Sequence, residues 1–183
     1  PLIFLPVQLL WLNLVTNGIQ DVALAFETGE KKFMQQPPRK PDESIFNRLM
    51  ISQTLISAGV ISLLAFGLWY HLLNHLKWEE STARNTVLLL MVLLQNFHAM
   101  NCRSETRSIF KIPISHNYVL MLGILAAQGL HILSLHLPFM QEILSLEPVA
   151  WETWLKLFFT ASIIVVVMEV FKLFHKNIPG VRK

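Results

Sequence analysis

The chain has little cysteine and little charge, and it lacks the short motifs of nucleotide and ester hydrolysis. Its single cysteine, Cys102, cannot form a disulfide within the chain. Neither a G-x-x-x-x-G-K-[ST] phosphate loop nor a G-x-S-x-G elbow is present, so we predict no catalytic residue and no cofactor-binding residue. The formal net charge of +3 is too small to indicate nucleic-acid binding. Internal repeats and low-complexity segments are also absent.

Apolar residues dominate what is present. They make up 53% of the 183 residues, the mean hydropathy is +0.47, and apolar runs recur at the length of a membrane span. We therefore expect an all-α, polytopic membrane helix bundle that occupies residues 1–183 as one domain. Because the chain begins at Pro1 rather than Met and has no signal peptide, we also expect it to be a fragment of a longer protein.

Five segments are long and apolar enough to be membrane-spanning helices. Polar loops separate them, and the first loop contains the pair Pro37-Pro38, which predicts a stiff, extended backbone. Pro113 prevents a continuous helix between the third and fourth spans, and residues 138–152 are expected to form a loop. The predicted spans are approximately residues 4–26, 49–73, 83–102, 118–137 and 154–174.

Lysine and arginine are distributed unevenly between the two sides of this predicted bundle. With five spans, twelve of the fifteen basic residues fall on the side of the loop at residues 27–48, and only Lys77, Arg84 and Lys156 fall on the other side. The positive-inside rule assigns the richer side to the cytoplasm. We therefore predict an integral, multi-pass membrane protein whose amino end lies outside the cell or in a lumen, and whose carboxyl end is cytoplasmic.

The first predicted span carries a row of polar side chains where lipid-facing residues are expected. At helical periodicity the row forms one stripe, which must face protein, water or an ion because unpaired polar groups are costly in hydrocarbon. Gly18 lets the backbone loosen and offer carbonyl oxygens. Carbonyl, amide and carboxylate oxygens are the ligands that a hard cation binds. The polar residues of the stripe are Asn13, Thr16, Asn17, Gln20 and Asp21.

Two explanations of the stripe compete. Asn, Gln and Thr often hydrogen-bond between membrane helices, and packing of this kind would explain one or two such residues. For five residues on one face, including the ionisable Asp21, an ion pathway is the better hypothesis.

The third predicted span has a second polar set, which consists of Gln95, Asn96, His98 and Asn101. From its residue type alone, Gln95 fits a hydrogen-bonding residue of the bundle. For His98, which lies on the same face, we favour a packing role over a proton relay or a ligand. In the fifth span, Glu169 is expected to be structural, in an ion pair with Lys172 three residues later.

The residues Pro6-Val7-Gln8-Leu9-Leu10-Trp11-Leu12-Asn13-Leu14-Val15-Thr16-Asn17-Gly18 resemble the sixth transmembrane helix of the P-type cation-transporting ATPases, and most of all that of the calcium pumps. The downstream Pro37-Pro38-Arg39 resembles the cytoplasmic loop that follows this helix. The resemblance implies that the chain is the last five helices of a ten-helix membrane domain.

The resemblance also implies a set of ion ligands. Asn13 and Thr16 match ligand positions of the sixth helix, Asn17 stands where the calcium pumps have an aspartate, and Gln95 stands where sarcoplasmic-type pumps have a glutamate. Asp21 lies one turn further toward the cytoplasm, where those pumps have a small residue. Two acids are thus amides here, and calcium sites are tuned by the number of charged ligands. The predicted metal-binding residues are Asn13, Thr16, Asn17, Asp21 and Gln95.

The function implied is that of the membrane part of an ATP-driven cation pump, with calcium as the favoured transported cation. Mg and ATP would act only through the cytoplasmic domains, since the phosphorylated Asp-Lys-Thr-Gly motif of these pumps is missing and the chain alone is not expected to hydrolyse ATP. Its partners would be the lipid bilayer and the remaining helices and cytoplasmic domains of the pump. The alternatives are a non-enzymatic scaffold or accessory subunit, in which the stripe is packing only, and half of a secondary transporter.

Overall fold

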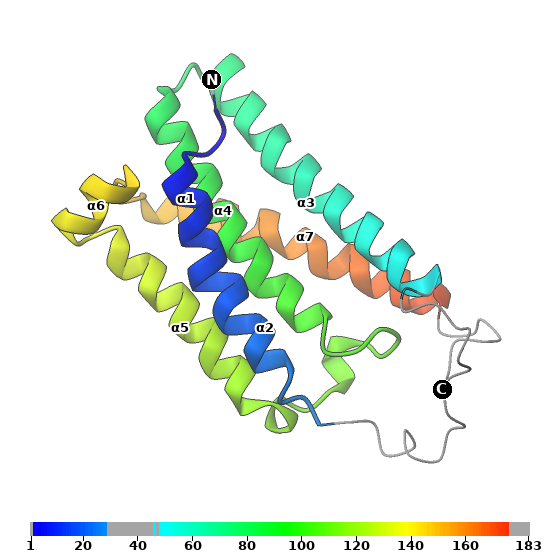
Figure 1. Cartoon of the computed structure of the whole chain (residues 1–183). Helices are drawn as coiled ribbons and strands as arrows, with labels where there is room; N and C mark the ends of the chain where they lie inside the picture. Colours follow the sequence, from blue (N-terminus) through cyan, green and yellow to red (C-terminus); the bar gives the residue numbers. More distant parts are fainter. Residues whose placement is uncertain (1, 29–45, 47, 176–183) are drawn as a thin grey trace, which may run out of the picture.

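The structure, a computed structural model, describes residues 2–28, 46 and 48–175, and every regular element within them is helical (Figure 1). The Pro37-Pro38-Arg39 loop and the end of the chain beyond His175 lie outside the described residues. The long helices confirm the all-α prediction, and four of the five predicted spans coincide with them to within three residues. These four are α3 (Arg48–Asn74), α4 (Glu80–Asn101), α5 (Tyr118–Ser134) and α7 (Trp151–His175).

The first predicted span is a continuous helical stretch made of three elements. It begins with α1 (Pro6–Leu12), continues through the π-helical turn η1 (Asn13–Asn17), and ends with α2 (Gly18–Leu24). Pro6 occupies the first helical position, where the missing N–H costs no hydrogen bond. The first turn is closed by Gln8, whose Oε1 accepts from the N–H of Leu5 at 3.0 Å.

Helix α4 lies in the middle of the bundle (Figure 1), where it packs against α3 and α7 on one side and against α5 and the first helical stretch on the other. Its central turns are apolar all round, which is the pattern expected of a helix buried on every face. They contact Leu157, Ala161 and Ile164 of α7, and the residues of α4 with no exposed surface include Leu88, Leu89, Leu90 and Leu94.

A close approach of two helices fixes the position of the first stretch. A Cβ atom added at Gly123 of α5 would lie 3.1 Å from Cγ2 of Ile19 and 3.6 Å from Cβ of Ala23, both on α2. The absence of a side chain at this position therefore lets α5 and α2 pack backbone to backbone, as small residues do between membrane helices.

The segment that follows α5 differs from the prediction. Residues 138–152 were expected to be a loop, but they include α6 (Pro138–Leu144), whose axis bends by 93° from that of α5. Pro138 is again at the first helical position, where proline favours the start of a helix rather than preventing one. The remaining short elements are the 3-10 turns η3 (Ile109–Lys111) and η4 (Ile114–His116), on either side of Pro113.

Length and composition identify two of the described helices, α3 and α7, as able to cross a membrane. A third candidate appears if the bent pair α5 and α6 is counted as one broken span. The apolar helices therefore agree with a membrane helix bundle, whereas the predicted number of five spans stays a prediction. The first stretch and α4 carry the polar residues of the predicted cation site.

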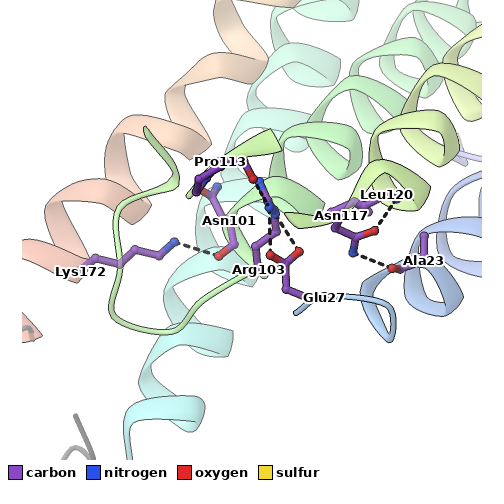
Figure 2. Close-up of polar contacts among 8 residues, drawn as sticks. All are labelled: Ala23, Glu27, Asn101, Arg103, Pro113, Asn117, Leu120 and Lys172. Atoms are coloured by element: carbon purple, nitrogen blue, oxygen red, sulfur yellow. Dashed lines mark hydrogen bonds and ion pairs between the residues drawn. The ribbon is translucent and has the colours of Figure 1, made fainter. Parts of the chain in front are cut away.

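Polar contacts tie four helices together at one end of the bundle (Figure 2). Arg103, just after α4, donates from Nε and Nη2 to the two carboxylate oxygens of Glu27, both at 2.9 Å, so that the pair is bidentate. The same Nη2 donates to the carbonyl of Pro113 at 2.9 Å. Asn117 accepts from the N–H of Leu120 as the N-cap of α5 and donates to the carbonyl of Ala23, each at 2.8 Å.

Helix α7 joins the same end through two side chains that bind backbone groups. The buried Lys172 donates from Nζ to the carbonyl of Asn101 at 2.9 Å, which satisfies a carbonyl at the end of α4 (Figure 2). Glu169 accepts from the N–H of Ile109 at 2.9 Å. Both residues are structural, as predicted for Glu169, but their hydrogen-bond partners are these backbone groups rather than each other.

Candidate cation site

The backbone of the first helical stretch departs from α-helical geometry at the predicted ligands. The turn η1 spans Asn13–Asn17, and the N–H of Gly18 donates to the carbonyl of Asn13, five residues back. A Cβ atom at Gly18 would lie 3.3 Å from that carbonyl oxygen, closer than most real contacts of this kind. Gly18 therefore leaves room for the π-helical turn, and such turns within α-helices are frequent at functional sites.

The polar stripe of five residues divides into two faces, which corrects the prediction of a single one. Thr16 and Gln20 are 0% and 3% exposed and face the bundle, whereas Asn13, Asn17 and Asp21 are exposed. At 100° per residue the five positions span about 140° around the helix axis, with Thr16 and Gln20 toward one edge of this arc and Asn17 and Asp21 toward the other. The extra residue in the π-helical turn further rotates Asn13 relative to the positions that follow it.

Three oxygen atoms gather around the hydroxyl of Thr16. Its Oγ1 lies 2.5 Å from the carbonyl of Leu12 and 3.5 Å from Oδ1 of Asn17, and it contacts Oε1 of Gln95 from α4. A hydroxyl has a single hydrogen to donate, so it cannot satisfy three acceptors at once. The arrangement is an oxygen-rich cluster, with one backbone carbonyl and three side chains, of the composition that a hard cation binds.

The structure brings together four of the five predicted site residues. Asn13 joins the cluster through its Oδ1, which accepts from Nδ2 of Asn17 at 3.0 Å. Asp21 lies one turn beyond Asn17 on the exposed face and has no hydrogen bond to the other four residues. Asp21 thus adds a carboxylate to the same face of the helix, without direct contact with the oxygen cluster.

A second polar connection between the helices was not predicted. Gln20 donates from Nε2 to Oδ1 of Asn96 at 2.5 Å, and Asn96 donates from Nδ2 to Oε1 of Gln128 at 3.0 Å. The three amides form a chain from α2 through α4 to α5. Gln20 and Asn96 were visible in the sequence as polar residues of spans, but no spacing rule connects either of them with Gln128.

Two histidines of the bundle have different surroundings. His98, predicted to be a packing residue, is half-buried on α4, with Nε2 3.5 Å from Sγ of Cys102; its Nδ1 is buried and has no hydrogen-bond partner among the residues that the structure describes. His131 is fully buried on α5 and accepts from Nε1 of Trp11 at 3.3 Å. Among the described residues, no group of three or more His, Cys, Asp or Glu side chains forms a metal site. The oxygen cluster around Thr16 consists of neutral groups.

Comparison with known proteins adds an independent observation. The family described as "Cation transporting ATPase, C-terminus" matches residues 1–174. The calcium-transporting ATPase of Bacillus subtilis is 32% identical over 85% of this chain and 17% of its own length. The endoplasmic reticulum calcium ATPase srcA of Aspergillus fumigatus is 28% identical over 94% of this chain and 21% of its own. The probable cation-transporting ATPase F of Mycobacterium tuberculosis is 30% identical over 90% of this chain and 18% of its own length.

The chain therefore spans about a fifth of the length of these relatives. The match covers the whole described structure except its last residue, and it includes the first helical stretch as well as the bundle behind it. The resemblance inferred from residues 6–18 is confirmed: the chain belongs to the family of the carboxyl-terminal regions of cation-transporting P-type ATPases.

Proposed function

We propose that the chain is the membrane part of an ATP-driven cation pump, and that the oxygen cluster around Thr16 belongs to the site of the transported cation. The observation that carries the proposal is that the side-chain oxygens of Thr16 and Asn17, both within a π-helical turn, meet that of Gln95 from α4. Ca²⁺ is the proposed cation, because neutral and carboxylate oxygens suit it and because two of the relatives cited are named as calcium ATPases.

In this proposal Asn13, Thr16, Asn17, Asp21 and Gln95 are the metal ligands that this chain supplies. Asn13, Asn17 and Asp21 are exposed on the described chain, so the face that they form is available to helices from elsewhere in the pump. The rest of the pump would supply those helices, together with the cytoplasmic domains that bind Mg and ATP. The Pro37-Pro38-Arg39 loop, outside the described residues, would contact the phosphorylation domain.

The proposed topology has five membrane-spanning stretches within a lipid bilayer, with the amino end outside or luminal and the carboxyl end cytoplasmic. The contacts among the ends of α2, α4 and α7 and the start of α5 support the alternation of direction that five passes require. Arg103 and Lys172, which make two of these contacts, belong to the basic side that the positive-inside rule assigns to the cytoplasm.

A second candidate function is that of a non-enzymatic scaffold or accessory subunit with a polar packing interface. The amide chain from Gln20 to Asn96 and Gln128 favours it, because these contacts are ordinary hydrogen bonds between membrane helices. The two functions differ in what they predict for the hydroxyl of Thr16. In a scaffold it stabilises packing, whereas in a pump it also affects the binding of the cation.

The test uses the full-length pump that the proposal implies and measures phosphorylation from ATP as a function of Ca²⁺ concentration. Thr16→Val removes the hydroxyl and keeps the shape, and we expect it to raise the half-maximal Ca²⁺ concentration by roughly tenfold, as the loss of a metal-site partner does. Thr16→Ser keeps the oxygen and should change little. Thr86→Val is the matched control, since Thr86 is a buried threonine whose hydroxyl also donates to the carbonyl four residues back.

In the same assay Asp21→Asn should raise the half-maximal concentration more than Thr16→Val does, because Asp21 is the one acid of the proposed ligand set. An unchanged value would remove Asp21 from the site and make it a hydrated residue of the membrane interface. If Thr16→Val and Asp21→Asn both leave the Ca²⁺ dependence unaltered, these residues serve helix packing and the pump-site proposal is wrong.

A further inference from the structure

We propose that Gln20 is an additional ligand of the transported cation, and that Asn96 and Gln128 are positioning residues that hold its carbonyl oxygen toward the cation. This inference rests on the proposed function, and it extends the predicted ligand set to a residue outside it. Three features of the described residues support it: the direction of the hydrogen bonds from Gln20 through Asn96 to Gln128, the free polar atom at each end of this chain, and the position of Gln20 between Asn17 and Asp21 in the sequence.

The amide chain has a definite direction. Gln20 turns its Nε2 into the bundle, where it donates to Oδ1 of Asn96 at 2.5 Å. Asn96 has used its oxygen as an acceptor and therefore presents Nδ2 to Oε1 of Gln128, at 3.0 Å. Since Gln20 and Asn96 are only 3% and 6% exposed, both hydrogen bonds lie inside the bundle, and the orientation of each amide is set by the next one.

The two ends of the chain are unlike. At the inner end, Nε2 of Gln128 is buried and has no hydrogen-bond partner in the described part of the protein. At the outer end, Oε1 of Gln20 accepts no hydrogen bond from any described residue, and it is not among the buried polar atoms that lack a partner. The free acceptor of the chain is thus not fully enclosed by the bundle, and it remains available to a further partner.

The opposite direction would give a different surface. If each amide were rotated, Gln128 would donate to Asn96, Asn96 would donate to the oxygen of Gln20, and Gln20 would turn its NH₂ group outward. An outward NH₂ group repels a cation, whereas an outward carbonyl oxygen is a ligand of the kind that Ca²⁺ accepts. The direction that the structure has is therefore the one in which Gln20 can bind a cation.

The position of Gln20 supports the same role. Gln20 follows Thr16 by four residues and precedes Asp21 by one, so its position on the helix lies between those of Thr16 and Asp21. Thr16 contacts Gln95, and Gln20 is bonded to Asn96. The two partners are thus adjacent residues of α4, whereas Thr16 and Gln20 are four residues apart on the first stretch. Gln20 would connect the carboxylate to the oxygen cluster.

The experiment measures Ca²⁺-dependent phosphorylation of the full-length pump in four proteins: the unaltered pump, Asn96→Leu, Gln20→Ala, and the double variant. Asn96→Leu removes both hydrogen bonds with a side chain of similar shape. We expect it to raise the half-maximal Ca²⁺ concentration roughly fivefold to tenfold, near the low end of the loss that follows removal of an outer partner of a metal site. The maximal phosphorylation at saturating Ca²⁺ should stay the same, which shows that the pump is folded.

Gln20→Ala should produce a similar shift, smaller than that of Asp21→Asn because it removes a neutral oxygen. The decisive measurement is the double variant. If Asn96 acts through Gln20, adding Asn96→Leu to Gln20→Ala produces no further shift, so the two effects are not additive. Asn96→Asp keeps the acceptor for Nε2 of Gln20, and it should restore the Ca²⁺ dependence when Gln20 is present but not in the Gln20→Ala background.

Additive shifts in the double variant would overturn the inference, because Asn96 would then act on packing rather than through Gln20. An unchanged Ca²⁺ dependence in Asn96→Leu, with a shift in Thr16→Val, would overturn it as well and would leave the proposed function intact. If Asn96→Leu gives no phosphorylated pump, Gln128→Leu replaces it. That variant keeps the bond between Gln20 and Asn96 and should cause a smaller shift that disappears in Gln20→Ala; a shift that persists there would contradict the inference.

Discussion

The ion pair of Glu27 and Arg103 should make one of the largest single contributions to the stability of the bundle. The side chain of Arg103 is 0% exposed and that of Glu27 is 16% exposed. Glu27→Gln removes the negative charge and leaves a buried guanidinium without a counter-ion, with only the carbonyl of Pro113 and the one amide oxygen of the new side chain to accept its hydrogen bonds. Breaking a buried pair in this way costs about 3–5 kcal/mol, and the partial exposure of Glu27 places the expected loss near 3 kcal/mol. That value corresponds to roughly a hundredfold change in the unfolding equilibrium.

The measurement is unfolding of the detergent-solubilised protein by SDS, followed by the fluorescence of its five tryptophans. The matched control is Glu80→Gln, which removes the acid of a second ion pair of the described residues, formed with Arg84 on α4. Because Glu80 is 45% exposed, its loss should cost less than about 1 kcal/mol. The double variant Glu27→Gln with Arg103→Met removes the unpaired charge and should regain part of the loss. Equal effects of Glu27→Gln and Glu80→Gln would refute the view that burial makes the first pair important.

Two further predictions concern the π-helical turn and the topology. Gly18→Ala presses a methyl group against the carbonyl of Asn13 and should raise the half-maximal Ca²⁺ concentration for phosphorylation. The control is Gly59→Ala, where nothing lies within 4 Å of the new Cβ, so this change should only stabilise α3, by up to about 1 kcal/mol. Equal Ca²⁺ dependence of the two variants would contradict a role for the turn. In sealed vesicles of known orientation and a Cys102→Ser background, a membrane-impermeant maleimide should label Glu79→Cys from the outer or luminal side and Ser115→Cys from the cytoplasmic side. Labelling of both from one side would show that the assumed alternation of spans is wrong.

The positions of the helices could be predicted from the sequence because apolar runs of span length are separated by proline and polar residues. The prediction of 49–73 for α3 (Arg48–Asn74) is correct to one residue at each end. The prediction of a loop after α5 was wrong, because the short helix α6 follows α5 at a sharp bend. Proline signals both the end of one helix and the first turn of the next, and only the packing of Leu144 against the first stretch decides between them.

The candidate site could be predicted only in part. Periodicity placed Thr16 and Gln20 on one stripe with Asn17, but it could not show that neighbouring helices bury the first two and leave Asn17 exposed. The pairing of Gln95 with Thr16 depends on the rotation of α4 about its own axis, which tertiary packing sets. The part played by Gln128 could not be predicted at all, because Gln128 is connected to Gln20 only through Asn96 and no local sequence pattern links it to either residue.

The two faces of the stripe have different physical requirements. Thr16 and Gln20 already have partners on α4, and the bundle stabilises them whether or not a cation binds. Asn13, Asn17 and Asp21 lie on the surface of the described chain, beside exposed apolar residues such as Leu14 and Val22. In a membrane, two amides and a carboxylate cannot face hydrocarbon without a large cost. Protein, water or a cation must therefore cover this face, and a cation there would have the oxygens of the buried face on its other side.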